Sequence, residues 1–388
     1  MPTYPTYKFS EIARSTKGKK PKTISKEKTN GFEIPYVDIK AFEKGIIDNY
    51  TDGENCTFCT PDEVLIVWDG ARCGFVGRGI EGAIGSTLAK ISSEEYINDY
   101  LFYFLQSKYK VLNSNPRGVG IPHIEPNLLW NFEIPDVDKT TQHQIVSRIE
   151  SLFAELDKAV EHLRTAQLQL KIYKQAVLNH WLNNEDGKWG MVKLGDVAEK
   201  IQIGPFGTQL HKSDYINGGI PLINPMHICN KKILPDYSFS VSDEKYKELT
   251  NYYLEKDDVI LGRRGEMGRC AVVSEKEDGM LCGTGSLFIR GGKLLDATYL
   301  CHLLSSQKLV SYFENSSSGT TMSNLNQGII KNCEIPFPPF SEQQRIVEEI
   351  ESRLSQAEAA EARIAEALQK TEALRQSILK KAFSGELV

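Results

Sequence analysis

The 388-residue sequence lacks several features that would identify a function directly. It has no run of 18 or more apolar residues, which excludes an ordinary transmembrane helix. The first eight residues lack the basic and then apolar layout of a signal peptide, so we expect a cytoplasmic protein with no membrane partner. The eight cysteines are scattered, and only Cys56 and Cys59 have metal-ligand spacing, without a second pair. Buried reduced thiols are the simpler interpretation.

Catalytic signatures are also scarce. There is no Gly-x4-Gly-Lys-Ser/Thr loop and no Gly-x-Ser-x-Gly elbow. Phe75–Gly79 and Phe337–Phe340 imitate two motifs of adenine methyltransferases, but Phe337 stands where the second motif needs an asparagine. Asp236 with Asp243–Lys245 weakly resembles a nuclease site, and a solvated turn explains it better. We therefore expect no catalysis by this chain alone, with a catalytic chain kept as a competing hypothesis.

Net charge gives no global sign of a polyanionic partner, since it is −5 at pH 7. The charge is uneven, however. Six lysines lie between positions 17 and 28 with only Glu27 against them, whereas the last helical segment is acidic in its first half. A nucleic acid would bind the first kind of surface and avoid the second.

The most informative feature that is present is a repeat. Asn131–Val146 returns 201 positions later as Asn332–Val347, and both copies open a long helical pattern. The segments before them share an order of strand-like runs, a helix and a polar loop. A repeat of this size indicates two copies of one globular unit, each followed by a long helix. Because the helices are similar and the globular units have diverged, we expect one scaffold that carries two different readers.

The repeat and the turn residues predict the elements. Each unit should contain two strands followed by a helix; these are expected at 63–68, 82–91 and 96–110 in the first unit, and at 258–261, 283–289 and 298–313 in the second. The predicted division is a first domain at 1–139, a first long helix at 140–186, a second domain at 187–340 and a second long helix at 341–385. Ser341 with Gln344 fits a capping box, and Gly187 and Gly385 fit helix stops.

Both long segments have the 3-4 apolar spacing of a coiled-coil seam. If the seams pair, the repeat makes the helices antiparallel, with a unit at each end of a span of roughly 58 Å at 1.5 Å per residue. The predicted fold class is α+β, with two pseudo-two-fold-related globular α/β domains joined by two long antiparallel coiled-coil helices. Tyr173 and Leu374 continue the seams, whose main positions are Ile145, Ile149, Leu152, Leu156, Leu163 and Leu170 in the first helix and Ile346, Ile350, Leu354, Ile364 and Ile378 in the second.

Basic and polar residues on glycine-rich loops are the candidate DNA-binding residues. Arginine can donate two hydrogen bonds to guanine in the major groove, and lysines and hydroxyl groups typically bind phosphates. Ordinary solvated loop charge is the competing interpretation. The candidates are Lys19, Lys20, Lys22, Arg72, Arg78, Arg117 and His123 in the first unit, and Lys212, Arg263, Arg264, Arg269, Thr320, Thr321 and Asn324 in the second.

Several motifs of the second unit carry a family resemblance. They are Gly204–Leu210, Gly219–Asn224, Asp258–Gly265, Ser318–Leu325 and the closing run Glu334–Val347. With the duplicated layout, the chain resembles the DNA-specificity (S) subunit of type I restriction–modification systems over essentially its whole length. The resemblance implies two target-recognition domains, each reading one half of a split, asymmetric site in double-stranded DNA. It also implies that the paired helices act as a ruler between the halves.

The resemblance implies the partners too. Two methyltransferase (M) subunits would dock on the helices and bring S-adenosylmethionine to methylate adenine. Restriction (R) subunits would add ATP-driven translocation and cleavage and would hold ATP and Mg, while this chain would hold no cofactor or metal. The first unit lacks Gly-Pro-Phe-Gly and carries Val67–Gly70 where the second has Gly262–Gly265, which predicts different half-sites. Two further hypotheses stay open: an S-like subunit of another methylation-based phage-defence system, and a coiled-coil adaptor that binds only proteins.

Overall fold

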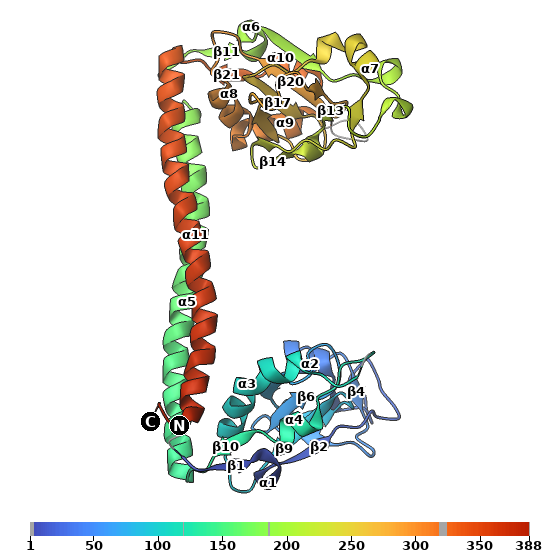
Figure 1. Ribbon diagram of the computed structural model, residues 1–388, viewed down its shortest axis with the longest axis vertical. Coiled ribbons are helices and arrows are strands. Elements are labelled where there is room, and N and C mark those ends of the chain that lie inside the picture. Colours follow the sequence, from blue (N-terminus) through green and yellow to red (C-terminus); the bar gives the residue numbers. More distant parts are fainter. Residues whose placement is uncertain (1–3, 119, 185–186, 318–323, 388) are drawn as a thin grey trace. The chain divides into compact units, whose positions relative to one another are not determined.

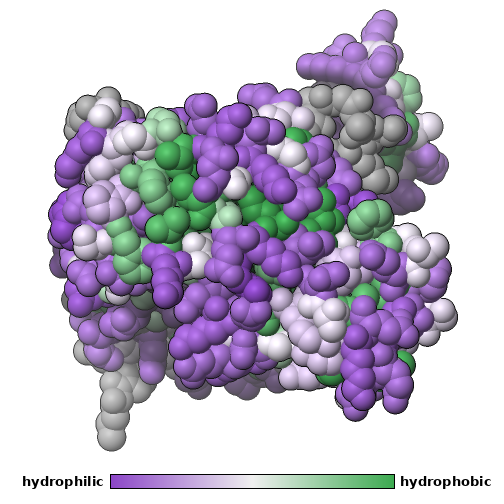
Figure 2. All heavy atoms as spheres, turned by 90° about the horizontal axis from the view of Figure 1, so that it is seen from above, coloured by the Kyte–Doolittle hydropathy of each residue, from purple (hydrophilic) through white to green (hydrophobic). Residues whose placement is uncertain are grey.

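The computed structural model describes residues 4–118, 120–184, 187–317 and 324–387. The chain forms two compact units: unit 1 comprises Met1–Thr165 and Ile364–Val388, and unit 2 comprises Ala166–Arg363. Each unit contains one sheet-rich domain and part of both long helices (Figure 1). In these described ranges no helix has the length and apolar character needed to span a membrane. Seen from above, the surface is mainly hydrophilic, with separate hydrophobic patches (Figure 2).

The domain of unit 1 contains two four-stranded sheets. The first has the order β2-β9-β6-β7 with antiparallel neighbours, and the second has the order β4-β3-β8-β5, in which β3 and β8 run parallel. The strands are β2 (Arg14–Lys17), β3 (Ile34–Val37), β4 (Tyr50–Thr51), β5 (Phe58–Cys59), β6 (Val64–Val67), β7 (Val76–Arg78), β8 (Gly82–Ile84) and β9 (Leu88–Ser92). Helix α3 (Asn98–Ser114) packs on β6 and β7 through buried apolar side chains such as Leu101 and Phe104.

Unit 2 repeats this topology. Its sheet β12-β20-β17-β18 matches β2-β9-β6-β7 strand for strand, and in the sheet β16-β13-β19 the strands β13 and β19 run parallel, as β3 and β8 do. The strands are β12 (Lys200–Ile203), β13 (Ile220–Ile223), β16 (Ser240–Val241), β17 (Asp258–Gly262), β18 (Cys270–Val272), β19 (Leu281–Cys282) and β20 (Ser286–Arg290), with the hairpin β14 (Ile228–Cys229) and β15 (Lys232–Ile233). The duplication predicted from the sequence is therefore present at the level of topology.

Short elements complete both domains. In each, a short strand at the N-terminal edge pairs antiparallel with the strand that precedes the long helix, β1 with β10 and β11 with β21. Their bounds, with those of the short helices, are β1 (Thr6–Lys8), α1 (Phe9–Ile12), α2 (Ile39–Lys44), α4 (Pro126–Trp130), β10 (Glu133–Pro135), β11 (Met191–Lys193), α6 (Leu194–Val197), η1 (Gly207–Gln209), η2 (Lys212–Asp214), η3 (Pro225–His227), α7 (Asp243–Glu248), η4 (Thr250–Tyr252), α10 (Gln327–Lys331) and β21 (Glu334–Pro336).

Two predicted elements are each divided in the structure. The run 82–91 forms β8 and β9 in different sheets, because Leu88 N–H donates to Gly85 O and turns the chain between them. The predicted helix 298–313 is α8 (Ala297–Leu304) followed by α9 (Gln307–Ser317). The Ser305 hydroxyl donates to Cys301 O, 2.9 Å away, as α8 ends. Predicted strands 63–68 and 258–261 are confirmed as β6 and β17. Six of the cysteines are buried, but Cys229 is exposed and Cys56 partly so.

The long helices are α5 (Lys139–Leu182) and α11 (Phe340–Ser384). Ser341 lies inside the first turn of α11, so the predicted capping box of this helix is wrong. The other long helix, α5, is capped by Asp138, which accepts from Thr141 N–H at 2.7 Å. The predicted stop at Gly187 is also wrong, because α5 ends earlier, before the left-handed Asn184. Gly385 is confirmed as the stop of α11: its φ is +81°, and Glu386 N–H donates to Lys381 O at 3.0 Å.

One buried glutamine ties each domain to the start of its long helix. In unit 1, Gln142 is 1% exposed; its Oε1 accepts from Ile97 N–H at 2.9 Å, and its Nε2 donates to the carbonyls of Glu95 (3.3 Å) and Val137 (2.9 Å). In unit 2, Gln343 is 0% exposed and makes the corresponding three bonds, to Asp296 N–H (2.8 Å) and to the carbonyls of Leu294 and Pro338 (3.0 Å each). These bonds fix the direction in which each helix leaves its domain.

The two long helices run antiparallel within each unit. In unit 1 the early part of α5 packs on the late part of α11, where Arg375 pairs with Asp157 and lies 4.6 Å from the Phe153 ring. In unit 2 the late part of α5 packs on the early part of α11, and Lys174 pairs with Glu361 at 2.8 Å. All eleven main seam positions are buried or half-buried. Tyr173 and Leu374 are more exposed, at 40% and 48%, although Tyr173 still interacts with Arg353 of α11.

Candidate nucleic-acid interface

In each unit, several strand ends and loops meet at one edge of the sheets. In unit 2, Arg263 N–H donates to Gly285 O (2.9 Å) and Leu325 N–H donates to Arg263 O (3.0 Å), which joins the end of β17 to the turn before β20 and to the loop before α10. Unit 1 makes the same two bonds from Trp68 N–H to Thr87 O (2.8 Å) and from Ile124 N–H to Trp68 O (2.9 Å). Trp68 and Arg263 are therefore structural equivalents, as the paired motifs Val67–Gly70 and Gly262–Gly265 suggest.

A three-residue ionic cluster lies at this edge of unit 1. Asp69, which follows Trp68, accepts from Lys17 Nζ at 2.7 Å and from His123 Nδ1 at 2.6 Å. Arg117 is exposed, and its backbone exchanges two hydrogen bonds of 2.9 Å with His123. The structure thus brings the predicted residues Arg117 and His123 to the end of β2. Lys17 and Asp69 were missed, because only the fold brings positions 17, 69 and 123 together.

The exposed lysines Lys19, Lys20 and Lys22 follow β2 directly and lie beside this cluster. Lys19 N–H donates to Ile84 O at 3.1 Å, so the lysine loop begins against the second sheet of the unit. The end of β2 therefore presents a group of cations next to the loop that carries Arg117. This arrangement is chemically suited to contact with phosphate oxygens.

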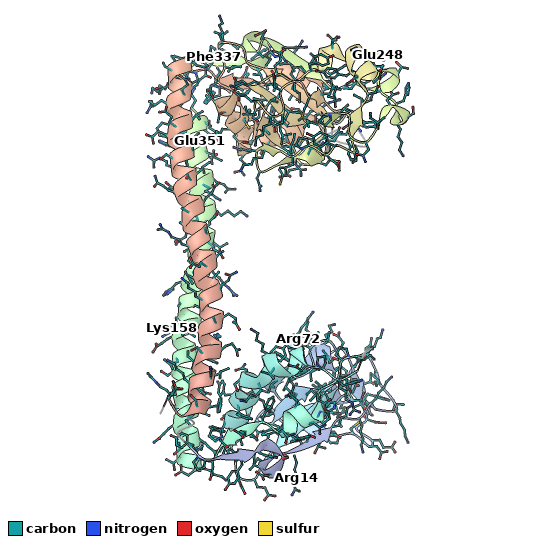
Figure 3. All side chains as sticks on the ribbon, in the orientation of Figure 1. Arg14, Arg72, Lys158, Glu248, Phe337 and Glu351 are labelled. Atoms are coloured by element: carbon teal, nitrogen blue, oxygen red, sulfur yellow. The ribbon has the colours of Figure 1, made fainter. Side chains whose placement is uncertain are left out.

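Arg72 and Arg78 have different environments in unit 1. Arg72 lies in the β6–β7 hairpin, pairs with Glu43 at 3.0 Å and stacks 4.1 Å from the Phe75 ring centroid. Figure 3 shows it at the side of the domain opposite Arg14, the first residue of β2. Arg78, in β7, lies opposite Val64 in the β6–β7 ladder and is therefore at the other end of β6. Its side chain forms an ion pair with Asp99 and lies 4.3 Å from the centroid of the Phe102 ring. These contacts hold Arg78 against α3, and its role as a DNA contact stays a prediction.

The three candidate arginines of unit 2 also differ in exposure. Arg263 is 9% exposed, and its Nε donates to Leu325 O at 2.7 Å. Burial, and then the neighbouring Arg264 charge, lowers the pKa of Arg263. Its guanidinium holds the loop at Leu325, and its role as a DNA contact stays a prediction. Arg264 is exposed and occupies the position of Asp69 in unit 1.

The remaining candidates of unit 2 lie on surrounding loops. Arg269 is held by Glu266, with Nη2 at 2.6 Å from a carboxylate oxygen, and its Nη1 donates to Pro225 O at 3.3 Å. Lys212 is exposed on η2. Asn324 is half-buried, and its Oδ1 is buried and accepts no hydrogen bond within the described part of the chain. The candidates Thr320 and Thr321 lie outside the described residues.

The segments that imitated catalytic motifs have structural roles. Phe337 N–H donates to Gly190 O at 2.9 Å, and Pro338 O accepts from Gln343. Asp236 accepts from both the N–H and the hydroxyl of Ser238, which lowers the pKa of its carboxyl group. Lys245 pairs with Glu248 at 2.9 Å. These contacts account for the look-alike residues as turn and helix stabilisers.

A family model described as "Type I restriction modification DNA specificity domain" matches residues 2–164 and 186–370. The chain belongs to this family. The two matched segments correspond to the two copies of the repeat, so each sheet-rich domain with the beginning of its long helix is one copy of the specificity domain.

Curated relatives agree with this assignment. The chain is 24% identical over 364 residues to the type I restriction enzyme MjaVIII specificity subunit of Methanocaldococcus jannaschii, covering 89% of this chain and 84% of that protein. It is 24% identical over 379 residues to the EcoBI specificity subunit of Escherichia coli, covering 91% and 80%. The similarity therefore runs through both domains and both helices.

Solved structures share the fold. The HsdS subunit from Thermoanaerobacter tengcongensis superposes with a TM-score of 0.64 at 21% identity, covering 100% of this chain and 98% of that chain. A chain from a structure titled as the structural basis of complex assembly and conformational transition of the type I R-M system gives a TM-score of 0.72 at 21% identity, covering 100% and 99%. The predicted fold class is confirmed. The exact domain boundaries and the DNA-contacting residues stay predictions.

Proposed function

We propose that this chain is the sequence-reading subunit of a type I restriction–modification complex and that each of its domains reads one half of a split DNA site. The observation that carries the proposal is the duplicated strand-end edge. The backbone contacts at this edge are the same in both units, whereas the side chains differ, with Asp69 in unit 1 where unit 2 has Arg264. The exposed Arg264 can donate to guanine in the major groove, whereas Asp69 already accepts from Lys17 and His123, so the two edges offer DNA different chemistry.

The long helices are the proposed dock for the other subunits. Two M subunits would bind them, bring S-adenosylmethionine and methylate adenine in each half-site, and R subunits would supply the ATP- and Mg-dependent cleavage. The chain itself binds double-stranded DNA in the cytoplasm and catalyses no step. Leu168 and Ile172, one helical turn apart on α5 in unit 2, are 66% and 65% exposed. Exposed apolar side chains at this spacing are suited to packing against a partner helix.

The test is co-expression with its M subunit, followed by single-molecule sequencing of the host DNA. We expect an asymmetric split motif with methyladenine in both halves. A continuous motif, or no methylation despite a stable complex, would show that the chain does not read DNA as two half-sites. Adding the R subunit to the same complex separates restriction from another methylation-based defence system by the presence of DNA cleavage.

A further inference from the structure

The loops that leave the first sheet strand of each unit are held by the same backbone approach. Gly18 N–H donates to Leu88 O at 2.9 Å in unit 1, and Gly204 N–H donates to Ser286 O at 3.0 Å in unit 2. A Cβ at Gly18 would lie 2.2 Å from Gly85 O, and one at Gly204 would lie 2.0 Å from Gly283 O. Only glycine fits such an approach. The Lys19–Lys22 segment is therefore the structural equivalent of the segment that follows Gly204.

The two equivalent loops present opposite chemistry. In unit 1 the side chains after the glycine are the exposed lysines Lys19, Lys20 and Lys22. In unit 2, Pro205 is buried and Phe206 is 63% exposed. The next residue, Gly207, has a φ of +63°, a conformation that L side chains rarely adopt, so the chain turns sharply after the exposed ring.

A second apolar side chain stands on the neighbouring strand end of unit 2. Met226, on η3, is 64% exposed. The preceding residue, Pro225, packs its ring closely against Gly262 and Gly285, where a Cβ would touch it. Gly285 also donates its N–H to Asn224 Oδ1 at 3.2 Å. The loop with Phe206 and the loop with Met226 therefore both rest on the Gly283–Gly285 turn, next to Arg263 and Arg264.

We propose that Phe206 makes an apolar contact with a base of the half-site that unit 2 reads, at the place where unit 1 holds phosphates with Lys19, Lys20 and Lys22. This inference rests on the proposed function. We expect equivalent loops of a duplicated DNA-reading domain to contact the same class of ligand. That ligand must therefore bind three lysine side chains in unit 1 and an exposed aromatic ring in unit 2. Duplex DNA offers both, because its phosphates are anionic and its major groove exposes the apolar methyl groups of thymine.

The experiment uses the complex of the full chain with its M partner and a DNA duplex that carries the methylated motif found by sequencing. Binding is measured at several salt concentrations, on the intact site and on duplexes with one base pair changed at a time. We expect Phe206→Ala to weaken binding about tenfold, because the apolar area that the ring buries against the DNA is lost. It should relax base preference in one half-site only and leave the salt dependence unchanged. Phe206→Lys should also lose the base preference but make the salt dependence steeper, by about one phosphate contact.

Two sets of variants serve as controls. Replacing Lys19, Lys20 and Lys22 together by alanine should weaken binding on all sequences and lower the slope of log K against log salt by about 3, without changing base preference. Leu294→Ala removes another exposed apolar side chain of unit 2, 55% exposed, beyond the far end of β20. It should change neither property. Thermal unfolding of Phe206→Ala should match the parent, because the ring is mostly in solvent.

The outcomes separate this inference from the proposed function. Unchanged affinity and base preference in Phe206→Ala, with a parent complex that methylates a split site, would overturn the inference and leave the proposed function standing. Loss of the M subunit from the Phe206→Ala complex on gel filtration would overturn it as well, because the loop would then contact protein. A parent complex that methylates no split site would overturn the proposed function itself.

Discussion

Gln142 and Gln343 make the same three hydrogen bonds in the two units, although the backbone groups that they contact belong to residues of different type. Gln142 contacts Glu95, Ile97 and Val137, and Gln343 contacts Leu294, Asp296 and Pro338. A glutamine amide can donate and accept at once, which a purely apolar side chain cannot do. The joint between domain and helix is therefore specified by one side chain and by the path of the backbone around it.

We expect Gln142→Ala to lower the free energy of unfolding by about 2 kcal/mol, because it leaves the buried Val137 carbonyl and two partly buried backbone groups without this partner. The neighbouring Gln144 is exposed, so Gln144→Ala should change stability by less than about 0.5 kcal/mol. Thermal and urea unfolding of both variants checks this. Equal stability of the two variants would show that the buried amide is not needed at the joint.

Arg263 and Arg264 should separate structural from binding effects. Arg263→Ala is expected to destabilise unit 2 by about 1–3 kcal/mol, since Leu325 O loses its buried donor. Arg264→Ala should leave stability within about 0.5 kcal/mol of the parent and should cost about 1–3 kcal/mol of base discrimination in one half-site. Unfolding curves and methylation of single-base variants of the site measure the two effects. A stability loss in Arg264→Ala that equals that of Arg263→Ala would contradict the assignment.

His302 should make unit 2 less stable in weak acid. Burial, and then the Lys231 ammonium, lowers the pKa of His302 to about 3, and Lys231 Nζ lies 2.6 Å from its Nδ1. The unfolded histidine has a pKa near 6.5, so between that pH and about pH 3 the unfolded state binds the extra proton. Stability is therefore fully present above pH 6.5 and should fall by about 2 kcal/mol from pH 6.5 to pH 5.

The measurement for this pH effect is calorimetric unfolding of the parent and of His302→Asn between pH 5 and pH 8. His302→Asn should show a flatter dependence, although His227, whose pKa burial also lowers, continues to contribute. His180 is exposed on α5 of the same unit, so His180→Asn should keep the parent slope. A His302→Asn curve parallel to that of the parent would mean that His302 takes up its proton without unfolding.

The length of the helices should set the gap between half-sites. Deleting seven residues from α5 and seven from α11 removes about 10 Å of helix, which corresponds to about 3 base pairs of DNA. We expect the methylome of this variant to show a shorter gap and unchanged half-sites. If this variant still methylates DNA and the gap between its half-sites is unchanged, the helices do not act as a ruler.

Each domain should read its half-site independently. Exchange of residues 190–330 for the same unit of a related S subunit is expected to change one half of the methylated motif only, because the strand-end edge of unit 2 lies within this segment. Sequencing of methylated DNA reports both halves in one experiment. A motif altered in both halves would contradict independent readers.

Sequence reasoning predicted most of the fold because the repeat compares the chain with itself. The helix starts, β6, β17 and the coiled-coil seams follow from periodicity, which local sequence carries. The split of 82–91 between two sheets was not predictable in this way, because it depends on the contact of Gly85 N–H with Val37 O, far away in the sequence. Tyr173 and Leu374 fit the seam by spacing, and their exposure depends on the partner helix.

The candidate site was predicted less completely. Residue type suggested Arg78 and Arg263, and it could not show that these side chains contact Asp99 and Leu325 within their own domains. The equivalence of Gly18 with Gly204 was missed, because the residues after the two glycines share no similarity and the close approach to Gly85 and Gly283 appears only in three dimensions. Backbone geometry is repeated at this edge, and side chains are not.

The glutamine joint has a consequence for how new specificities arise. Because each glutamine contacts only main-chain groups, the residues around it are free to change, as Glu95 against Leu294 and Val137 against Pro338 already show. A domain acquired by recombination needs only the same backbone path to fit an existing helix. Under the proposed function, a domain that reads a new half-site would then require no matching change at this joint.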